Sequence, residues 1–337
     1  MESGTVIPSY HLAYTTHGKL NEQGENVVWV FHALTANSDP AEWWDGLVGE
    51  GKIFDPSKWF IVCVNMPGSC YGSIGPLDTN PTGNEAYLHD FPFFTPRDMI
   101  RAYKPLREFL GIQRIHIGIG GSMGGQQLLE WAIEEPNLFE HIFPIATNAQ
   151  HSPWGMAFNA SQRWCIESDP TWKEKNDRAG IEGMKVARSI ALISYRHYDT
   201  YLQSQPNAHN DQIENFRSES YQRYQGEKLA KRFNAFSYYK LSQSMDSHNV
   251  GRTRGTVEAA LQQIQAKTLA IGIETDILFP PLEQQLIAAH IPGAHFKLIR
   301  SDYGHDGFLL EFKSIGNLIH EFIHSEKNPI PKFAVTN

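Results

Sequence analysis

The sequence predicts an α/β protein with a mainly parallel central sheet. Short runs of β-branched and aromatic residues recur along the chain, and a segment with helical spacing of its apolar residues lies between two of them. Such alternation is typical of parallel sheets, whose strands are buried on both faces. We expect strands at residues 27–34, 59–65, 115–119, 143–146, 268–273 and 296–299.

The expected helices show the start signals and spacing of amphipathic helices. Thr95 and Pro96 form a typical helix start, and apolar residues follow at helical spacing as far as Leu110. We expect further helices at residues 126–134 and at about residues 307–324.

The length of 337 residues exceeds what one ordinary core needs, so we expect one main domain with an insertion. From residue 152 to residue 251, strand-like runs give way to a stretch rich in Trp, Gln, Asn, Tyr and Arg with helical spacing. The sequence therefore predicts a core in two parts, residues 1–151 and 252–337. A helical lid, residues 152–251, is inserted between them over the carboxyl edge of the sheet.

The composition argues against several classes of binding partner, namely nucleic acid, metal ions and membranes. The net charge of -8 argues mildly against nucleic acid. The three cysteines, Cys63, Cys70 and Cys165, match no metal-ligand spacing, so we expect no metal site and interpret Cys63 as a buried thiol. The N-terminus lacks the features of a signal peptide, and no apolar run approaches the ~18 residues of a membrane span. We expect a cytoplasmic protein without a membrane partner.

The strongest local motif is Gly-x-Ser-x-Gly at residues 120–124, directly between an expected strand and an expected helix. A sharp strand-to-helix turn needs small flanking residues because the serine is held in a strained conformation with its hydroxyl above the sheet. Glycine-rich turns also cradle phosphates, but a dinucleotide motif beginning at Gly118 fails at Met123. We therefore favour Ser122 as a nucleophile over a phosphate-binding loop.

A nucleophilic serine needs a histidine base and an acid that orients it. In the α/β-hydrolase fold the acid follows the serine and the histidine comes last. Asp276 lies just beyond the expected strand at 268–273, and His305 lies in a glycine-bounded loop after the last expected strand. The sequence therefore predicts an α/β-hydrolase fold with a catalytic triad of Ser122, Asp276 and His305.

An acyl-transfer site also needs two donors aimed at the developing oxyanion. The backbone N–H of Met123, which follows the nucleophile, is one candidate, and that of Leu34, in the loop at residues 32–37, is the other. On spacing alone, that loop is equally well explained as a plain strand-to-helix connection.

Several segments occur in an order that is specific to one family. They are residues 13–21, 32–35, 70–76, 90–99, 120–125, 157–172, 276–281 and 304–311. Together they resemble the homoserine O-acetyltransferase family of the α/β-hydrolase superfamily over nearly the whole chain. The resemblance implies transfer of an acetyl group from acetyl-CoA to the hydroxyl of L-homoserine, the committing step toward methionine. It implies no permanently bound cofactor, since acetyl-CoA is a substrate, and a homodimer formed largely through the lid.

The resemblance also implies roles for three residues of the acceptor pocket. The stretch at residues 187–195 is similar to the substrate-binding helix of the family, which makes Arg188 the candidate partner of the homoserine carboxylate. Tyr195 would help to shape the pocket, and Asp306 would receive the homoserine ammonium. Without the resemblance, Arg188 is explained as a solvated helix residue.

Two departures leave the acyl group and the acceptor open. Ala36 and Asn37 stand where many relatives have Gly-Asp, and Leu192 replaces a histidine often seen in the lid helix. Succinyl-CoA as donor and serine as acceptor therefore stay alternatives, as does an esterase that uses the same triad. A ligand-binding protein that has kept the fold but not turnover is the rival from another class, and an intact triad argues against it.

Overall fold

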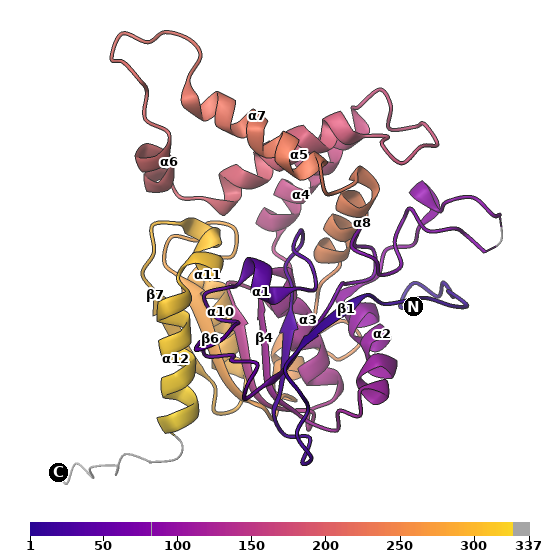
Figure 1. Ribbon diagram of the computed structural model, residues 1–337, viewed down its shortest axis with the longest axis vertical. Coiled ribbons are helices and arrows are strands. Elements are labelled where there is room, and N and C mark those ends of the chain that lie inside the picture. The colour runs from indigo at the N-terminus through magenta and orange to yellow at the C-terminus, as the bar shows by residue number, and fades with distance from the viewer. Residues whose placement is uncertain (82, 326–337) are drawn as a thin grey trace.

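A seven-stranded sheet forms the centre of the molecule (Figure 1). The structure is a computed structural model that describes residues 1–81 and 83–325, so the end of the second expected core part, residues 326–337, lies outside the described residues. The strand order is β1-β3-β2-β4-β5-β6-β7, and among these strands only β1 is antiparallel to its neighbour. The predicted α/β fold with a mainly parallel sheet is confirmed. The strands are β1 (Tyr14–His17), β2 (Val27–Phe31), β3 (Phe60–Val64), β4 (Ile115–Gly121), β5 (Phe139–Ile145), β6 (Lys267–Ile273) and β7 (His295–Ile299).

Strand β1 was not predicted. It lies at the edge of the sheet, and its residues Tyr-Thr-Thr-His alternate between exposed and half-buried positions. Continuous apolar runs mark strands that are buried on both faces, such as β2 and β3. A short polar edge strand gives no such signal.

Helices cover both faces of the sheet (Figure 1). Apolar side chains of α2 (Pro96–Phe109), α3 (Met123–Glu134), α9 (Val257–Leu261) and α10 (Pro281–His290) belong to the core on one face. The core on the other face includes side chains of α1 (Pro40–Trp43), α11 (Gly307–Leu310) and α12 (Phe312–Ser325). Most of the sheet is therefore a buried platform for the loops at its ends.

The helix expected at about residues 307–324 is two helices, which corrects the prediction. Helix α11 ends at Leu310, and α12 begins at Phe312. A continuous helix would use the Phe308 carbonyl to accept the Phe312 N–H. That carbonyl instead accepts a hydrogen bond from the Trp44 indole at 3.0 Å. The break thus coincides with a tertiary contact that no local sequence pattern predicts.

Between β5 and β6, the first five helices gather above the sheet, and the sixth, α9, packs on one of its faces (Figure 1). Helix α5 packs against α4 and α7, and it also contacts the short 3-10 helix η2 (Gly304–Asp306). No helix in the described part of the chain is long and apolar enough to cross a membrane. The five helices are α4 (Pro153–Glu167), α5 (Ile181–Tyr195), α6 (Tyr198–Ser204), α7 (Arg217–Ala230) and α8 (Ala235–Asp246).

Candidate active site

Ser122 lies at the sharp turn between β4 and α3. Its backbone has φ 56° and ψ -128°, a region that residues other than glycine rarely adopt. The Ser122 N–H donates to the Ile145 carbonyl at 3.0 Å, and the Ser122 carbonyl accepts a hydrogen bond from the Thr147 hydroxyl at 2.7 Å. The neighbouring strand and the loop after it therefore hold the strained conformation.

Glycines on both sides of Ser122 allow this turn to close. A Cβ atom at Gly124 would lie 2.1 Å from the Phe31 carbonyl oxygen, and one at Gly120 would lie 2.6 Å from the Gly124 backbone. A side chain at Gly124 would push α3 away from β2, and one at Gly120 would push α3 away from β4. The Gly-x-Ser-x-Gly pattern therefore reflects close backbone packing around Ser122.

His305 and Asp276 form a buried pair. His305 Nδ1 lies 2.6 Å from Asp276 Oδ2, and each residue is only 3% exposed. The other carboxylate oxygen, Oδ1, accepts the N–H groups of Leu278 and Phe279 at 2.8 and 2.9 Å. A carboxylate held in this way accepts the Nδ1–H of the imidazole and leaves Nε2 as the basic nitrogen.

Three aromatic rings surround the imidazole of His305. The Phe279 ring stacks on it with the ring centres 5.1 Å apart, and the rings of Phe308 and Tyr195 lie 5.2 and 5.7 Å away. The three rings come from three separate segments, so they restrict the imidazole from several sides. The sequence predicts no role for Phe279 or Phe308, because only the folded chain brings them to His305.

Six of the predicted site residues line one cavity of about 570 Å³. Two others lie behind it: Asp276 contacts the far nitrogen of His305, and Met123 follows Ser122 as the first residue of α3. The cavity also has lining residues that sequence analysis did not single out, among them Glu42, Tyr71, Lys228 and Arg232. The six predicted residues that line it are Leu34, Ser122, Arg188, Tyr195, His305 and Asp306.

The two expected oxyanion donors are N–H groups that local structure leaves unused. Met123 begins α3, and the first N–H groups of a helix have no acceptor within it. Leu34 is a central residue of the turn closed by the Ala36 N–H and the Ala33 carbonyl at 3.1 Å, a bond that does not involve the Leu34 N–H. The contact of Gly124 with the end of β2 brings the Leu34 loop beside the start of α3.

His32 ties this loop to the chain after β3. Its Nδ1 lies 2.8 Å from the Ala33 carbonyl, and its Nε2 accepts the Met66 N–H at 3.0 Å, so Nδ1 carries the proton. Burial lowers the pKa of His32 to about 4, which keeps the ring neutral at neutral pH. His32 begins one of the family segments, residues 32–35, but the sequence predicts no role for its side chain.

Arg188, Tyr195 and Asp306 lie around the same cavity. The Arg188 guanidinium carbon lies 5.5 Å from the centre of the Tyr195 ring, which is a cation–π distance. Asp306 Oδ2 accepts a hydrogen bond from Arg196 Nε at 3.2 Å, and the Arg196 guanidinium lies 5.0 Å from the Tyr221 ring. Arg196 does not line the cavity, so it holds Asp306 from behind. Arg196 was not predicted from the sequence, although it directly follows Tyr195.

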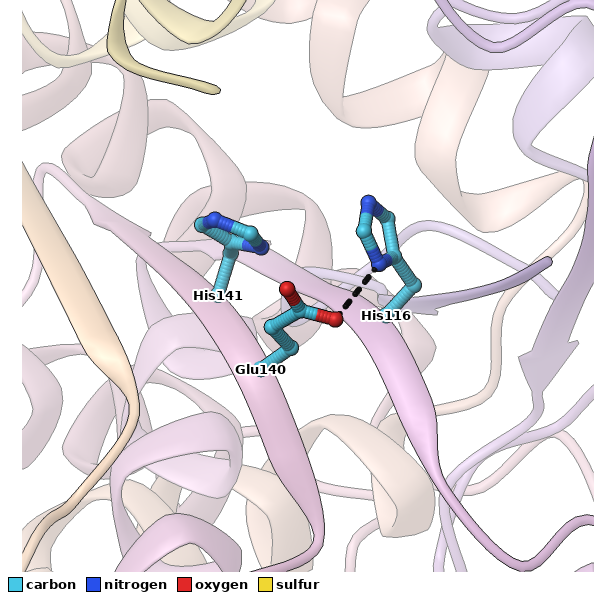
Figure 2. A group of neighbouring side chains, drawn as sticks. All are labelled: His116, Glu140 and His141. Carbon is cyan, nitrogen blue, oxygen red and sulfur yellow. Dashed lines mark hydrogen bonds and ion pairs between the residues drawn. The ribbon is translucent and has the colours of Figure 1, made fainter. Parts of the chain in front are cut away.

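A second group of titratable side chains lies near the amino ends of β4 and β5 (Figure 2). His116, Glu140 and His141 each offer one possible metal ligand, and these ligand atoms all lie within 4.8 Å of one another. Cysteine spacing, on which the expectation of no metal site depends, carries no information about these three residues.

Known proteins resemble this chain over most of its length. Residues 26–312 match the family model of the α/β-hydrolase fold. A homoserine O-acetyltransferase of Cyclobacterium marinum is 48% identical over 322 residues, covering 96% of this chain and 92% of that protein. One of Nostoc punctiforme is 41% identical over 334 residues, covering 96% and 94%.

Two solved structures have the same fold at 24% sequence identity. The homoserine O-acetyltransferase from Bacillus anthracis superposes with a TM-score of 0.86, covering 93% of this chain and 91% of that one. Esterase E22 also superposes with a TM-score of 0.86, covering 95% and 96%. The predicted α/β-hydrolase fold and family resemblance are confirmed. The matched family model and relatives of up to 48% identity show that the chain belongs to the homoserine O-acetyltransferases, a family of acyltransferases with the α/β-hydrolase fold.

Proposed function

We propose that this enzyme transfers an acetyl group from acetyl-CoA to the side-chain hydroxyl of L-homoserine, with Ser122 as the nucleophile. One observation carries the proposal: a single cavity contains Ser122 and His305 together with a cation, Arg188, and an anion, Asp306. L-homoserine bears a carboxylate and an ammonium in addition to its hydroxyl. The two charges of the cavity therefore match the two charges of this acceptor.

In the first half-reaction, His305 Nε2 takes the proton of Ser122 while the serine oxygen attacks the thioester carbonyl. Asp276 stabilises the imidazolium that forms. The N–H groups of Leu34 and Met123 stabilise the oxyanion, and the positive end of the α3 dipole adds to this field. The C–S bond then breaks, and the CoA thiol takes the proton from His305, which leaves acetyl-Ser122.

In the second half-reaction, the homoserine hydroxyl gives its proton to His305 and attacks the acetyl carbonyl. The bond between the acetyl carbon and the Ser122 oxygen breaks, and Ser122 regains a proton. Because CoA departs before the acceptor reacts, the kinetics are ping-pong, with parallel double-reciprocal lines. Mass spectrometry after mixing with acetyl-CoA alone should detect the acetyl adduct on Ser122.

The acceptor is held by its two charges. Arg188 offers the carboxylate a planar pair of donors, and its contact with the Tyr195 ring orients the guanidinium. Asp306 binds the ammonium, and Arg196 fixes the carboxylate of Asp306. Holding the acceptor hydroxyl beside acetyl-Ser122 favours transfer over hydrolysis.

One experiment tests donor, acceptor and reaction type together. Thiol release is measured with acetyl-CoA and with succinyl-CoA, each in the presence of homoserine, serine or no acceptor. We expect the fastest turnover with acetyl-CoA and homoserine, and thiol release without an acceptor to stop near one equivalent of enzyme. Sustained release without an acceptor would identify a hydrolase. Faster turnover with succinyl-CoA would identify succinyl-CoA as the acyl donor, and faster turnover with serine would identify serine as the acceptor.

We propose methionine biosynthesis in the cytoplasm as the setting, on the strength of the family resemblance. We further propose a homodimer that forms through the lid. Its support is the exposure of large apolar side chains on two lid helices that pack together: Trp164 on α4, and Val186 and Ile193 on α5. Val186 and Ile193 lie seven residues apart, on one stripe of α5, and exposed apolar surface of this kind is typical of an interface.

A further inference from the structure

His116, Glu140 and His141 take no part in the proposed reaction. His116 is the second residue of β4, and Ser122 follows the last, so roughly 20 Å of extended chain separates the two residues. Because β4 and β5 are parallel, the group lies toward the amino ends of both strands, away from the cavity that contains Ser122. A function of this group would therefore be separate from acyl transfer.

The three side chains converge (Figure 2). His116 Nδ1 lies 2.9 Å from Glu140 Oε2, and the ring centres of His116 and His141 are 5.1 Å apart. The two possible imidazole ligands and the carboxylate ligand all lie within 4.8 Å of one another. In a tetrahedral zinc site with bonds of about 2.1 Å, ligand atoms are roughly 3.4 Å apart, so a small side-chain movement would close the group around an ion.

The surrounding structure restricts the side chains. Ile117 of β4 pairs with His141 of β5, so the group is built on two adjacent strands of the central sheet. The Trp59 ring stacks on His116 with the ring centres 5.2 Å apart, and His141 is only 2% exposed. Ligands held on rigid strands by packing lose little freedom when an ion binds.

The group is open to solvent on one side. His116 and Glu140 line a cavity of about 490 Å³, which also contains Lys58 and Arg114. A glutamate carboxylate is an anionic ligand at neutral pH, and the cavity has room for water at the remaining coordination position.

We propose that His116, Glu140 and His141 form a binding site for a divalent transition metal ion, with Zn²⁺ as the best match. Two imidazoles and one carboxylate are a common zinc ligand set, and a water molecule from the cavity would complete four-coordination. The ion would bind His116 through an unprotonated ring nitrogen and would replace the hydrogen bond between His116 and Glu140. By bridging β4 and β5, the ion would stabilise the folded chain without altering acyl transfer.

The test is zinc binding by the full chain after dialysis against a chelator. Isothermal titration calorimetry with ZnCl₂ at pH 7.5 should show one tight site per chain, and saturating zinc should raise Tm. His116→Gln and Glu140→Gln, at partly exposed positions, should each weaken binding at least about tenfold, since loss of even an outer partner of a zinc ligand costs that much. Acyl transfer within about twofold of wild type would show that the variants fold.

The control is a second histidine pair that could also chelate zinc. His320 and His324 stack on the surface of α12 with the ring centres 4.0 Å apart. The double variant His320→Gln, His324→Gln should keep the tight site. The proposal is overturned if the wild type binds no zinc, if His116→Gln and Glu140→Gln bind it as well as the wild type, or if only the α12 variant loses it.

Discussion

Among single residues, Ser122 uses different groups for the reaction and for holding its own backbone. The contacts that hold its strained backbone use the Ser122 N–H and carbonyl groups, not its hydroxyl. We therefore expect Ser122→Ala to lower acyl transfer by about 10⁴-fold or more while leaving the unfolding midpoint in urea unchanged. The assay is thiol release from acetyl-CoA with homoserine. Retention of more than about a tenth of the wild-type rate would remove Ser122 from the mechanism.

Arg188 tests the acceptor pocket. Arg188→Lys replaces a planar pair of donors with a point charge on a flexible stem, which should cost about 1–3 kcal/mol, or roughly 5- to 150-fold in kcat/KM for homoserine. Acylation of Ser122 by acetyl-CoA alone should keep its original rate, because homoserine is absent from that half-reaction. An equal loss in both half-reactions would mean that Arg188 supports the lid or the path of CoA.

Arg196 acts through Asp306. Without the Arg196 hydrogen bond, the carboxylate of Asp306 loses a fixed orientation, so we expect Arg196→Gln to raise KM for homoserine about 3- to 30-fold. The preference for homoserine over 4-hydroxybutanoate, which lacks the ammonium, should shrink as well.

The control for Arg196 is Arg223→Gln, which removes an exposed arginine that pairs with Glu219 at 3.0 Å on α7. This variant should behave like the wild type. If Arg196→Gln impairs both acceptors equally, Arg196 has a merely structural role.

The sequence predicts the residues of this site whose chemistry has a local signature. Glycines beside Ser122 mark a tight turn, and the loops after two strands mark Asp276 and His305. Arg196 has no such signature, because its partner Asp306 is 110 positions away in the chain. The contact of Phe279 with His305 depends in the same way on the folded arrangement.

At the scale of elements, strands buried on both faces were predictable because their apolar runs are continuous. The edge strand β1 and the break between α11 and α12 were not. The first is polar, and the second coincides with the hydrogen bond from Trp44 to the Phe308 carbonyl. Long-range contacts thus limit what local periodicity can establish.

The outer face of α5 tests the proposed dimer. Val186 and Ile193 are 54% and 55% exposed and lie seven residues apart, on one stripe of the helix. We expect the double variant Val186→Asp, Ile193→Asp to be a monomer by light scattering at a concentration at which the wild type is a dimer, because an interface cannot bury unpaired carboxylates without a large penalty.

The control for this variant is Phe109→Asp, at a 79% exposed apolar position on the core helix α2. It should stay dimeric. If the double variant on α5 is still a dimer, the interface lies elsewhere on the molecule. If the wild type is a monomer, the proposed dimer is wrong.

At the scale of the whole molecule, buried histidines should make folding sensitive to mild acid. Burial lowers the pKa of His32 and of His151 to about 4 and that of His248 to about 3. In the unfolded chain these groups have a pKa of about 6.5, so as pH falls below that value the unfolded state binds protons that the folded state does not. Their contribution to stability is complete above about pH 7 and is lost as pH falls from about 6.5 toward 4.

The size of this loss can be tested at one histidine. Between pH 7 and pH 5, each such histidine should lower the free energy of unfolding by up to about 2 kcal/mol. His248 Nε2 lies 3.0 Å from the Asn148 carbonyl, and the amide of a glutamine can donate to the same carbonyl without titrating. His248→Gln should therefore lose less stability than the wild type over this range in urea unfolding. His11→Gln, at an exposed side chain, should follow the wild type. If His248→Gln loses as much stability as the wild type, the acid sensitivity originates in other groups.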